Sequence, residues 1–344
     1  MSNNSSPTSI ELVQKLAAEV GLELSASIPI QTLPEKTMER FENWLNNGYH
    51  GEMNYLNRAY ELGQDLRKWK SWAKSLLIFA VPYQRKPGGF LGGGRVASYA
   101  LGSDYHNVLG RKLKRLGKRL RRHNICDQAR PTVDAAPVLE REWAYLGKVG
   151  WRGKNTLLIH PDHGPMVLLC ELLIDKELPE WSARTELKTT CGTCEMCINE
   201  CPTSAFISPA ELDARRCISY FTIENTKEPI PVEFRKKMKD WVFGCDDCST
   251  ICPFGSKNTA YEHRWDTHPA FKTTRLAQLL TINEQDFHKL FTGSPLRRAG
   301  WEGLLRNACI ALGNLGIEKD ALEKATSHSS PMVREHAAWG LGQF

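Results

Sequence analysis

The chain has 344 residues, a net charge of +6 and eleven cysteines. This length is enough for two or three domains with cores of their own, so the cysteines need not replace a missing core. The longest purely apolar run, LLIFAV at residues 76–81, is far shorter than the roughly 20 residues that span a bilayer. The first residues, MSNNSSPTSIE, contain neither the apolar segment of a signal peptide nor a twin arginine. We therefore expect a cytoplasmic protein without a membrane partner.

The first part of the chain predicts a domain of helices and strands. Residues 8–11 form the capping-box pattern that starts a helix. Continuous apolar runs at 75–83 and 164–173 predict buried strands, whereas 110–123 carries leucines at helical spacing. Strands that alternate with helices are typical of the α/β class. We therefore expect an α/β domain over residues 1–183.

The last part of the chain has a helical pattern. Segments 305–316 and 333–344 share an arginine, small residues and a Leu-Gly pair at similar offsets, which predicts stacked hairpins of a HEAT-like helical repeat. Two unrelated, alanine-rich amphipathic helices are the alternative. We therefore expect an α+β multidomain protein whose three domains cover residues 1–183, 184–262 and 263–344.

Eight of the eleven cysteines crowd between Cys191 and Cys252. The run CGTCEMCINECP has the spacing C-x2-C-x2-C-x3-C-P with which bacterial ferredoxins hold iron–sulfur clusters. In such a run three thiolates bind one cluster and the fourth binds the other. The second run, GCDDCSTICP, repeats the last three cysteines of the pattern, and Cys217 is the nearest unassigned cysteine that completes it.

This crossing rule predicts two [4Fe–4S] clusters in a domain like a bacterial ferredoxin. The predicted ligands of the first cluster are Cys191, Cys194, Cys197 and Cys252. The predicted ligands of the second cluster are Cys201, Cys217, Cys245 and Cys248. A structural zinc site is the alternative, but four tetrahedral ligands in paired knuckles would leave the triple run unexplained.

Several longer stretches resemble one enzyme family. GEMNYL, SDYHNVLGRKLKRL and VDAAPVLEREWAYLGKVGWRGKNTLLI precede the cysteine runs, and RRCISYFTIE lies between them. With the two cysteine runs and the helical repeat, these stretches resemble epoxyqueuosine reductase, a cobalamin-dependent iron–sulfur family of tRNA modification. The resemblance covers almost the whole chain, from residue 8 onwards.

The resemblance implies that epoxyqueuosine at the wobble position of tRNA is reduced to queuosine. Electrons would pass from an external low-potential donor of the flavodoxin or ferredoxin type through two clusters to cobalamin. The resemblance also implies that Asp134 in TVDAAP supplies a proton and contacts cobalamin. The other implied cobalamin contacts are Arg67, Ala97, Leu158, Leu169, Ser219, Cys245 and Asp246.

The residue types at these positions suit a corrin ring. A corrin has broad apolar faces and a fringe of amides, so its pocket should combine small and aliphatic residues with a few polar groups. Leu158 and Leu169 can equally be core residues, and Arg67 in DLRKW can be a solvated surface charge. We expect that His106 in SDYHNVLG does not bind cobalt, and that it either has a structural role or lies behind the residues that contact the cofactor.

Asp134 must be protonated in order to act as an acid. The segment TVDAAP contains no cation that would stabilise the charged form. We therefore expect burial against the corrin to raise the pKa of Asp134. The other interpretation is an aspartate that caps a helix beginning near Pro137.

Clusters of basic residues indicate a polyanionic partner. Residues 110–123 include eight Lys or Arg side chains. Such groups suit tRNA because each neutralised phosphate releases counterions, although a solvated surface helix is the plain alternative. The predicted tRNA contacts are Lys227, which lies between cluster ligands, and the basic residues Arg297, Arg298 and Arg306 near the helical repeat.

Two other functions are compatible with clusters beside a large domain. A cobalamin-dependent reductive dehalogenase also passes electrons from clusters to cobalt, but it is expected to carry an export signal and to lack the basic helical tail. A non-enzymatic iron–sulfur electron carrier would leave residues 1–183 without a role. We therefore expect a monomeric enzyme that acts on tRNA.

Overall fold

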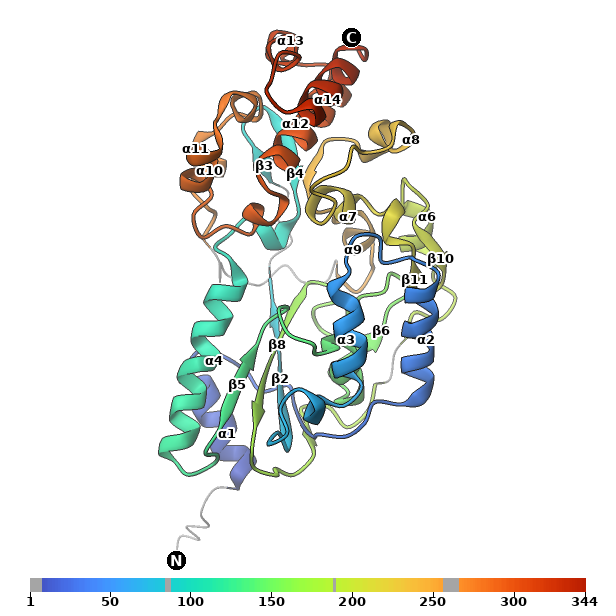
Figure 1. Ribbon diagram of the computed structural model, residues 1–344. Coiled ribbons are helices and arrows are strands. Elements are labelled where there is room, and N and C mark those ends of the chain that lie inside the picture. The colour runs from blue at the N-terminus through green and yellow to red at the C-terminus, as the bar shows by residue number, and fades with distance from the viewer. Residues whose placement is uncertain (1–7, 84–87, 188–189, 256–265) are drawn as a thin grey trace, which may run out of the picture.

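The computed structural model describes residues 8–83, 88–187, 190–255 and 266–344. The predicted boundary between the second and third domains lies outside these residues. In Figure 1 a sheet flanked by helices forms the lower part of the molecule, and the C-terminal helices lie at the top. Within the described residues, no helix is long and apolar enough to cross a membrane.

A five-stranded sheet is the centre of the lower part. Its strand order is β5-β8-β2-β1-β9, and every neighbouring pair in it is antiparallel. The strands are β1 (Ala26–Pro29), β2 (Ser75–Pro82), β5 (Ala129–Thr132), β8 (Val167–Ile174) and β9 (Trp181–Ser182). The two predicted strands are confirmed as β2 and β8. The α/β class implies mainly parallel strands, so it is wrong for this sheet, and α+β describes the domain.

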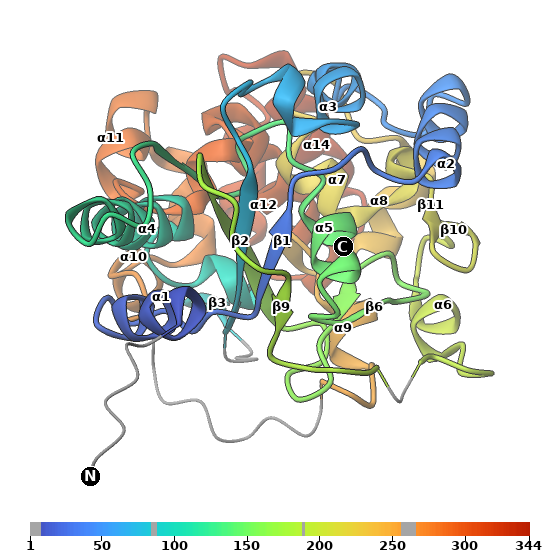
Figure 2. The same cartoon turned by 90° about the horizontal axis from the view of Figure 1, so that it is seen from below.

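Helices cover both faces of this sheet. Successive side chains of β2 point to opposite faces: Leu77 and Phe79 pack with α1 and α4, whereas Leu76 and Ile78 pack with α2 and α5. Figure 2 shows α1 and α4 on one side of the strands and α2, α3 and α5 on the other. The helices are α1 (Ser9–Ala18), α2 (Glu35–Asn46), α3 (Tyr55–Gly63), α4 (Tyr105–Arg122) and α5 (Glu140–Leu146). The predicted capping box starts α1.

The cysteine-rich segment consists of short elements. Its helices are α6 (Met196–Glu200), α7 (Ile218–Ile223), α8 (Val232–Arg235) and α9 (Asp247–Thr250). Its strands are β10 (Phe206–Ser208), β11 (Glu211–Leu212) and β12 (Trp241–Phe243). A hairpin of β6 (Trp151–Arg152) and β7 (Leu158–Ile159) from the preceding domain packs against Cys252. The preceding domain therefore helps to hold the cysteine-rich segment in place.

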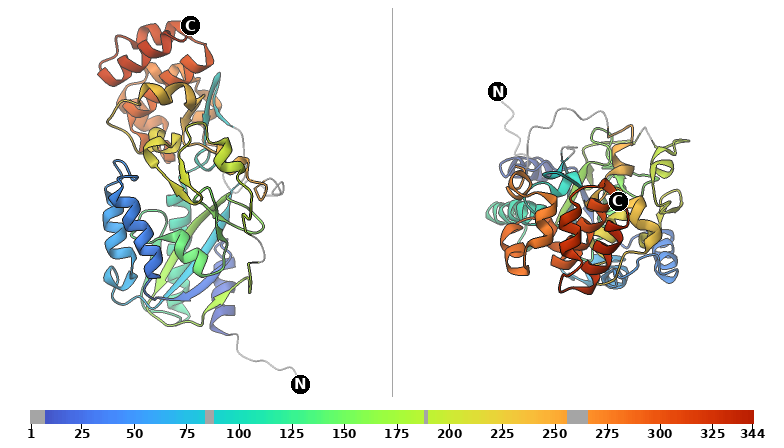
Figure 3. Two further views of the ribbon diagram at one scale, coloured as in Figure 1. Left: turned by 90° about the vertical axis from the view of Figure 1, so that its right-hand side faces the viewer. Right: turned by 90° about the horizontal axis from the view of Figure 1, so that it is seen from above.

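The C-terminal helices share their core with earlier parts of the chain. The helices are α10 (Ala270–Thr273), α11 (Glu284–Leu290), α12 (Trp301–Leu315), α13 (Lys319–Ala325) and α14 (Pro331–Leu341). The two similar segments lie on α12 and α14, which pack against each other at one end of the molecule (Figure 3). Their core includes β12 and the strands β3 (Gly89–Phe90) and β4 (Gly93–Val96), which form one sheet. All three predicted domains therefore contribute to this core.

Candidate active site

The fold brings the first predicted ligand set together. One small cavity beside the β6–β7 hairpin is lined by Cys191, Cys194, Cys197 and Cys252. Three of these cysteines belong to the first run, whereas Cys252 is the last cysteine of the second run. This grouping is the one that the crossing rule of double-cluster ferredoxins requires.

The second predicted ligand set lies beside the first. Cys248 is close enough to Cys217 and Cys201 for their charges to interact, and Cys245 is close to Cys217 and Cys248. Cys248 also interacts with Cys197 of the first set. The two sets are therefore neighbours, as an electron path between two clusters requires.

Hydrogen-bond donors point at sulfur atoms in both sets. Trp151 Nε1 lies 3.4 Å from Cys191 Sγ, and the backbone nitrogen of Ala205 lies 3.3 Å from Cys201 Sγ. Such donors stabilise thiolates and tune the potential of a cluster. Within the described residues, no three His, Cys, Asp or Glu side chains converge as ligands of a single metal ion. A four-iron cluster binds each thiolate through a different iron, so the grouped cysteines fit such a cluster better than zinc.

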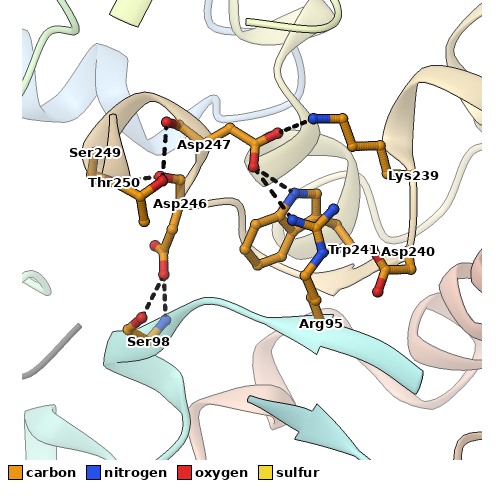
Figure 4. Close-up of polar contacts among 9 residues, drawn as sticks. All are labelled: Arg95, Ser98, Lys239, Asp240, Trp241, Asp246, Asp247, Ser249 and Thr250. Carbon is orange, nitrogen blue, oxygen red and sulfur yellow. Dashed lines mark hydrogen bonds and ion pairs between the residues drawn. The ribbon is translucent and has the colours of Figure 1, made fainter. Parts of the chain in front are cut away.

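Two neighbouring aspartates fix the turn that carries Cys245 and Cys248 of the second ligand set (Figure 4). Asp246 Oδ2 accepts hydrogen bonds from the backbone nitrogen and the hydroxyl of Ser98, both at 2.7 Å. Asp247 points away from Ser98 and accepts hydrogen bonds from Trp241 Nε1 at 3.2 Å and Lys239 Nζ at 3.1 Å. These contacts tie α9 and the cysteines beside it to β12 and to the chain after β4.

A group of tyrosines lies between this turn and the loop that carries Asp134. The ring of Tyr99 packs 5.8 Å from the ring of Tyr105 and 6.5 Å from the ring of Tyr83. Burial raises the pKa of Tyr99, and the negative charges of Asp134 and Asp246 raise it further. The predicted proton donor and a predicted cobalamin contact therefore flank the same ring.

Asp134 lies in the loop between β5 and α5 with a left-handed φ of 48°. Its Oδ2 accepts a hydrogen bond from the Tyr105 hydroxyl at 2.6 Å and lies 3.7 Å from His106 Nε2. Its backbone N–H donates to Glu140 Oε1 at 2.7 Å. Helix α5 begins only at Glu140, and its N-cap is Leu139, without a side-chain hydrogen bond. The interpretation of Asp134 as a helix cap is therefore wrong.

The neighbours of Asp134 favour its charged form. Partial burial tends to raise the pKa of this carboxyl group, but the ion pair with His106 and the hydrogen bond from Tyr105 outweigh that effect and lower it. The side chain is 63% exposed, which weakens the effect of burial. The expected rise in pKa from burial against the corrin stays a prediction. Among the groups of the protein itself, folding places the His106 cation beside TVDAAP, a segment without a cation of its own, and this lowers the pKa of Asp134.

His106 holds the proton that Asp134 lacks. Its Nδ1 lies 2.7 Å from Asp104 Oδ1, and the same aspartate caps α4 by accepting from the backbone nitrogen of His106 at 3.0 Å. Partial burial tends to lower the pKa of His106, but the contacts with Asp104 and Asp134 outweigh it and raise the pKa to about 9. At neutral pH, His106 is therefore a cation paired with Asp134.

Four predicted cobalamin contacts lie around the second ligand set. The backbone nitrogen of Ala97 donates to the carbonyl of Phe243 at 2.8 Å, which places Ala97 beside Cys245 and Asp246. Ser219 is half-buried on α7, which packs against β12. A small side chain, a hydroxyl and backbone polar groups suit the amide fringe of a corrin.

The other three predicted cobalamin contacts lie on the sheet side. Leu158 and Leu169 belong to the core that the sheet shares with α2 and α5. Their exposed fractions are only 4% and 9%, so most of their surface has a packing role. Arg67 is exposed and pairs with Asp65, with its Nη2 2.6 Å from Oδ2.

Arg306 does not reach the surface. It is 1% exposed, and its guanidinium donates hydrogen bonds to the carbonyls of Phe221, Asn225 and Glu228. Burial lowers the pKa of Arg306 to about 9. The prediction that Arg306 contacts tRNA is therefore wrong, because its donors hold the segment between two cluster ligands.

The remaining predicted tRNA contacts are exposed. They are Lys227, Arg297 and Arg298. Arg298 pairs with Glu224 at 2.8 Å and lies over the ring of Tyr55, 5.6 Å from its centre. Its charge also helps to lower the pKa of Asp134. Arg298 and Tyr55 therefore lie at the edge of the Asp134 site.

Several residues of this site had little or no signal in the sequence. Tyr105 is the first residue of α4, directly after its N-cap Asp104, and an aspartate followed by the helical leucine spacing is the signal that could have pointed to it. Tyr55, Tyr99 and Glu140 come from separate segments, and only the tertiary structure brings them to Asp134. A single sequence does not contain that information.

Two family models match the chain. Residues 64–135 match the model described as "Epoxyqueuosine reductase QueG, DUF1730". Residues 190–255 match the model of a "4Fe-4S double cluster binding domain". The two matches cover the part of the chain with Asp134 and the part with both cysteine runs.

Whole-chain comparisons agree with these models. The epoxyqueuosine reductase of Cyclobacterium marinum is 37% identical over 300 residues, which cover 86% of this chain and 94% of the relative. A solved epoxyqueuosine reductase with an epoxyqueuosine-modified tRNA-Tyr stem loop has a TM-score of 0.83 and 26% identity, covering 98% of this chain and 91% of the other. A Bacillus subtilis structure with its catalytic aspartate loop swung out of the active site has a TM-score of 0.81, with the same identity and coverage. The chain therefore belongs to the epoxyqueuosine reductase family and is an oxidoreductase.

Proposed function

We propose that this protein reduces epoxyqueuosine in tRNA to queuosine, with two [4Fe–4S] clusters, cobalamin and Asp134 as the proton donor. The relatives of the same family and the solved complex with a modified tRNA stem loop support this substrate. One observation carries the chemistry: Asp134, which pairs with His106, and Asp246, which lies in the turn with Cys245 and Cys248, both lie near enough to Tyr99 for their charges to act on it. Proton delivery and electron delivery can therefore meet at one place.

The reaction requires both electrons and protons. Removing the epoxide oxygen as water, with formation of an alkene, takes two electrons and two protons. When bound, the clusters and cobalamin would supply the electrons. An alkoxide is a poor leaving group, so the protein must deliver a proton as the carbon–oxygen bond breaks.

We assign proton delivery to the pair of Asp134 and His106. At neutral pH the proton resides on His106. The Nε2 atom of His106 lies 3.7 Å from Asp134 Oδ2, so the proton can pass from the imidazole to the carboxylate. The exposed carboxylate of Asp134 can then face the substrate. The Bacillus subtilis structure with a displaced catalytic aspartate loop supports this role for the loop.

The cofactors are assigned to the residues that the sequence predicts. The first cluster takes Cys191, Cys194, Cys197 and Cys252, and the second takes Cys201, Cys217, Cys245 and Cys248. Cobalamin is assigned to the space between the second ligand set and the sheet, with contacts from Arg67, Ala97, Asp134, Leu158, Leu169, Ser219, Cys245 and Asp246. These residue types fit a corrin, whereas its exact contacts are part of the proposal.

The partners are also part of the proposal. We assign tRNA binding to Lys227, Arg297 and Arg298, since all three are exposed and Arg298 lies at the edge of the site. An external flavodoxin or ferredoxin would supply electrons to a monomeric enzyme. Membership of a reductase family argues against a non-enzymatic electron carrier, and the relatives named for an RNA nucleoside argue against a dehalogenase.

The test is to replace Asp134 by asparagine. The amide cannot release an acidic proton, so queuosine formation in a single turnover should fall by about 10²- to 10⁴-fold, the usual contribution of general acid catalysis. Clusters, cobalamin content and tRNA affinity should be unchanged. Asp127→Asn, an exposed aspartate before β5, is the matched control and should turn over normally. Near-normal turnover by Asp134→Asn would remove Asp134 from the mechanism.

A further inference from the structure

One carboxyl group lies inside the sheet, away from the surface. Glu171 on β8 is fully buried, and Leu169 and Leu173 on the same face belong to the core that α5 covers. Thr132 of β5 pairs with it in register and donates its hydroxyl to Glu171 Oε2 at 2.8 Å. Among the described residues, Glu171 Oε1 has no hydrogen-bond donor. A buried carboxylate oxygen without a donor is unfavourable, so this oxygen requires a proton from a neighbour.

Glu140 is the neighbour that can provide this proton. It is the first residue of α5, and its carboxyl group lies within hydrogen-bonding reach of Glu171. Glu140 Oε1 also accepts the backbone N–H of Asp134 at 2.7 Å. A chain of contacts therefore runs from the centre of the sheet through two carboxyl groups to the backbone of Asp134.

Within the part of the chain that the structure describes, no cation contacts this carboxyl pair. Asp134 faces both carboxyl groups, and the thiol of Cys170 lies beside Glu171. Lys112 belongs to α4 on the other face of the sheet, where its charge acts to lower the pKa of Cys170. His106 contacts the far side of this group, at Asp134. A fully buried carboxylate and a half-buried one in such surroundings cannot both be ionised, because their charges repel and water solvates them poorly.

We propose that Glu140 and Glu171 share one proton and act as positioning residues that hold the Asp134 loop in its catalytic conformation. This inference rests on the proposed role of Asp134 as proton donor. The shared proton satisfies the second oxygen of Glu171 and leaves Glu140 Oε1 to accept the N–H of Asp134. A left-handed φ is unfavourable for an aspartate, so the loop needs such an anchor to keep the Asp134 carboxylate at Tyr105 and His106.

The anchor should weaken at alkaline pH. Burial and the charge of Asp134 raise the pKa of Glu171 to about 8, and burial and the charge of Glu171 raise the pKa of Glu140 well above 4.5. The protonated pair is the form that holds the loop. Its contribution is therefore complete below the ordinary carboxyl pKa of 4.5 and is lost as the pH rises through about 8. Loss of the proton leaves two like charges that push Glu140 away.

Hydrogen–deuterium exchange of the loop, residues 133–139, tests this inference in the anaerobically prepared holoenzyme. After correction for intrinsic exchange, protection of the wild-type loop should fall about tenfold between neutral and alkaline pH, because one hydrogen bond is lost. Glu140→Ala should show the same loss already at neutral pH. Glu171→Gln donates its amide to Glu140 at every pH, so its loop should stay protected under alkaline conditions.

Glu142→Gln is the matched control. Glu142 lies on the same helix, but its carboxylate accepts hydrogen bonds from Arg152 rather than from the loop. Its exchange should follow that of the wild type at every pH. If Glu140→Ala fails to fold or to retain its clusters, the isosteric Glu171→Gln still carries the test. Equal alkaline exchange in the wild type and Glu171→Gln would overturn the proposal.

Turnover of the same samples separates this inference from the proposed function. Asp134→Asn keeps its backbone N–H, so its loop should remain protected while queuosine formation is lost. Normal turnover by this variant, with protection that still depends on Glu140, would refute the donor role and leave the anchor standing. An inactive Asp134→Asn, with protection that is indifferent to Glu140 and Glu171, would refute only the anchor.

Discussion

The ion pair between His106 and Asp134 links catalysis to pH. His106 carries the proton with a pKa of about 9, so turnover should fall as the pH rises through that value. His106→Gln removes this proton store. The pH at which turnover falls should then shift to acidic values, where Asp134 alone titrates. Single-turnover rates across the pH range measure the shift, in a Glu171→Gln background that suppresses the pH dependence of the loop anchor. An unchanged alkaline limb would exclude His106 from proton delivery.

Two arginines of one basic group should behave in opposite ways. Arg306→Ala leaves three backbone carbonyls between cluster ligands without donors, at about 1–3 kcal/mol each, so the melting temperature should fall sharply. Arg297 is exposed, and its Nη2 lies 3.4 Å from His288 Nδ1. Arg297→Ala should leave the melting temperature unchanged and weaken tRNA binding with a smaller salt dependence. Calorimetry and binding titrations at several salt concentrations distinguish the two roles, and equal stability of both variants would contradict the argument.

Close packing between α12 and α14 depends on small residues. A Cβ on Gly313 would lie 2.6 Å from the Cα of Gly340, so Gly313→Ala should force the helices apart and cost about 1–3 kcal/mol. Gly303 on the same helix is the control, because the nearest atom to an added Cβ is 3.9 Å away. Gly303→Ala should stabilise the protein by up to about 1 kcal/mol through helix propensity. Thermal unfolding measures both variants. Melting temperatures that shift in opposite directions would support this packing, whereas equal shifts of the melting temperature would contradict it.

The sequence predicts individual elements better than their partners. Strands β2 and β8 were predictable because both are continuous apolar runs, and α4 was predictable from its leucine spacing. Their antiparallel pairing depends on chain connections that hydrophobic periodicity does not encode. The two cysteine runs were predictable because the spacing within each run is local, whereas Cys201, Cys217 and Cys252 are far in sequence from the other members of their sets. The environment of Asp134 was not predictable, since His106, Arg298 and Glu140 reach it from three separate elements.

At the scale of the whole molecule, the two ligand sets should fail independently. Cys217→Ser removes a thiolate from the second set only, so iron content should fall from about eight to about four per chain. The control is Cys126→Ser, a buried cysteine in the core between the sheet and α4. It should retain all of the iron. Iron and sulfide analysis of anaerobic samples decides the assignment, and full iron content in Cys217→Ser would refute it.

The core that the C-terminal helices share with earlier segments also determines when the clusters can be loaded during synthesis. Strands β3, β4 and β12 bury their side chains against α12, and Arg306 on that helix anchors the segment between Cys217 and Cys245. The eight cysteines of the two ligand sets precede α12 in the chain. During synthesis they therefore leave the ribosome before the helix that orders their surroundings. Stable cluster loading should await completion of the chain, so that a nascent protein without its last helices remains a metal-free intermediate.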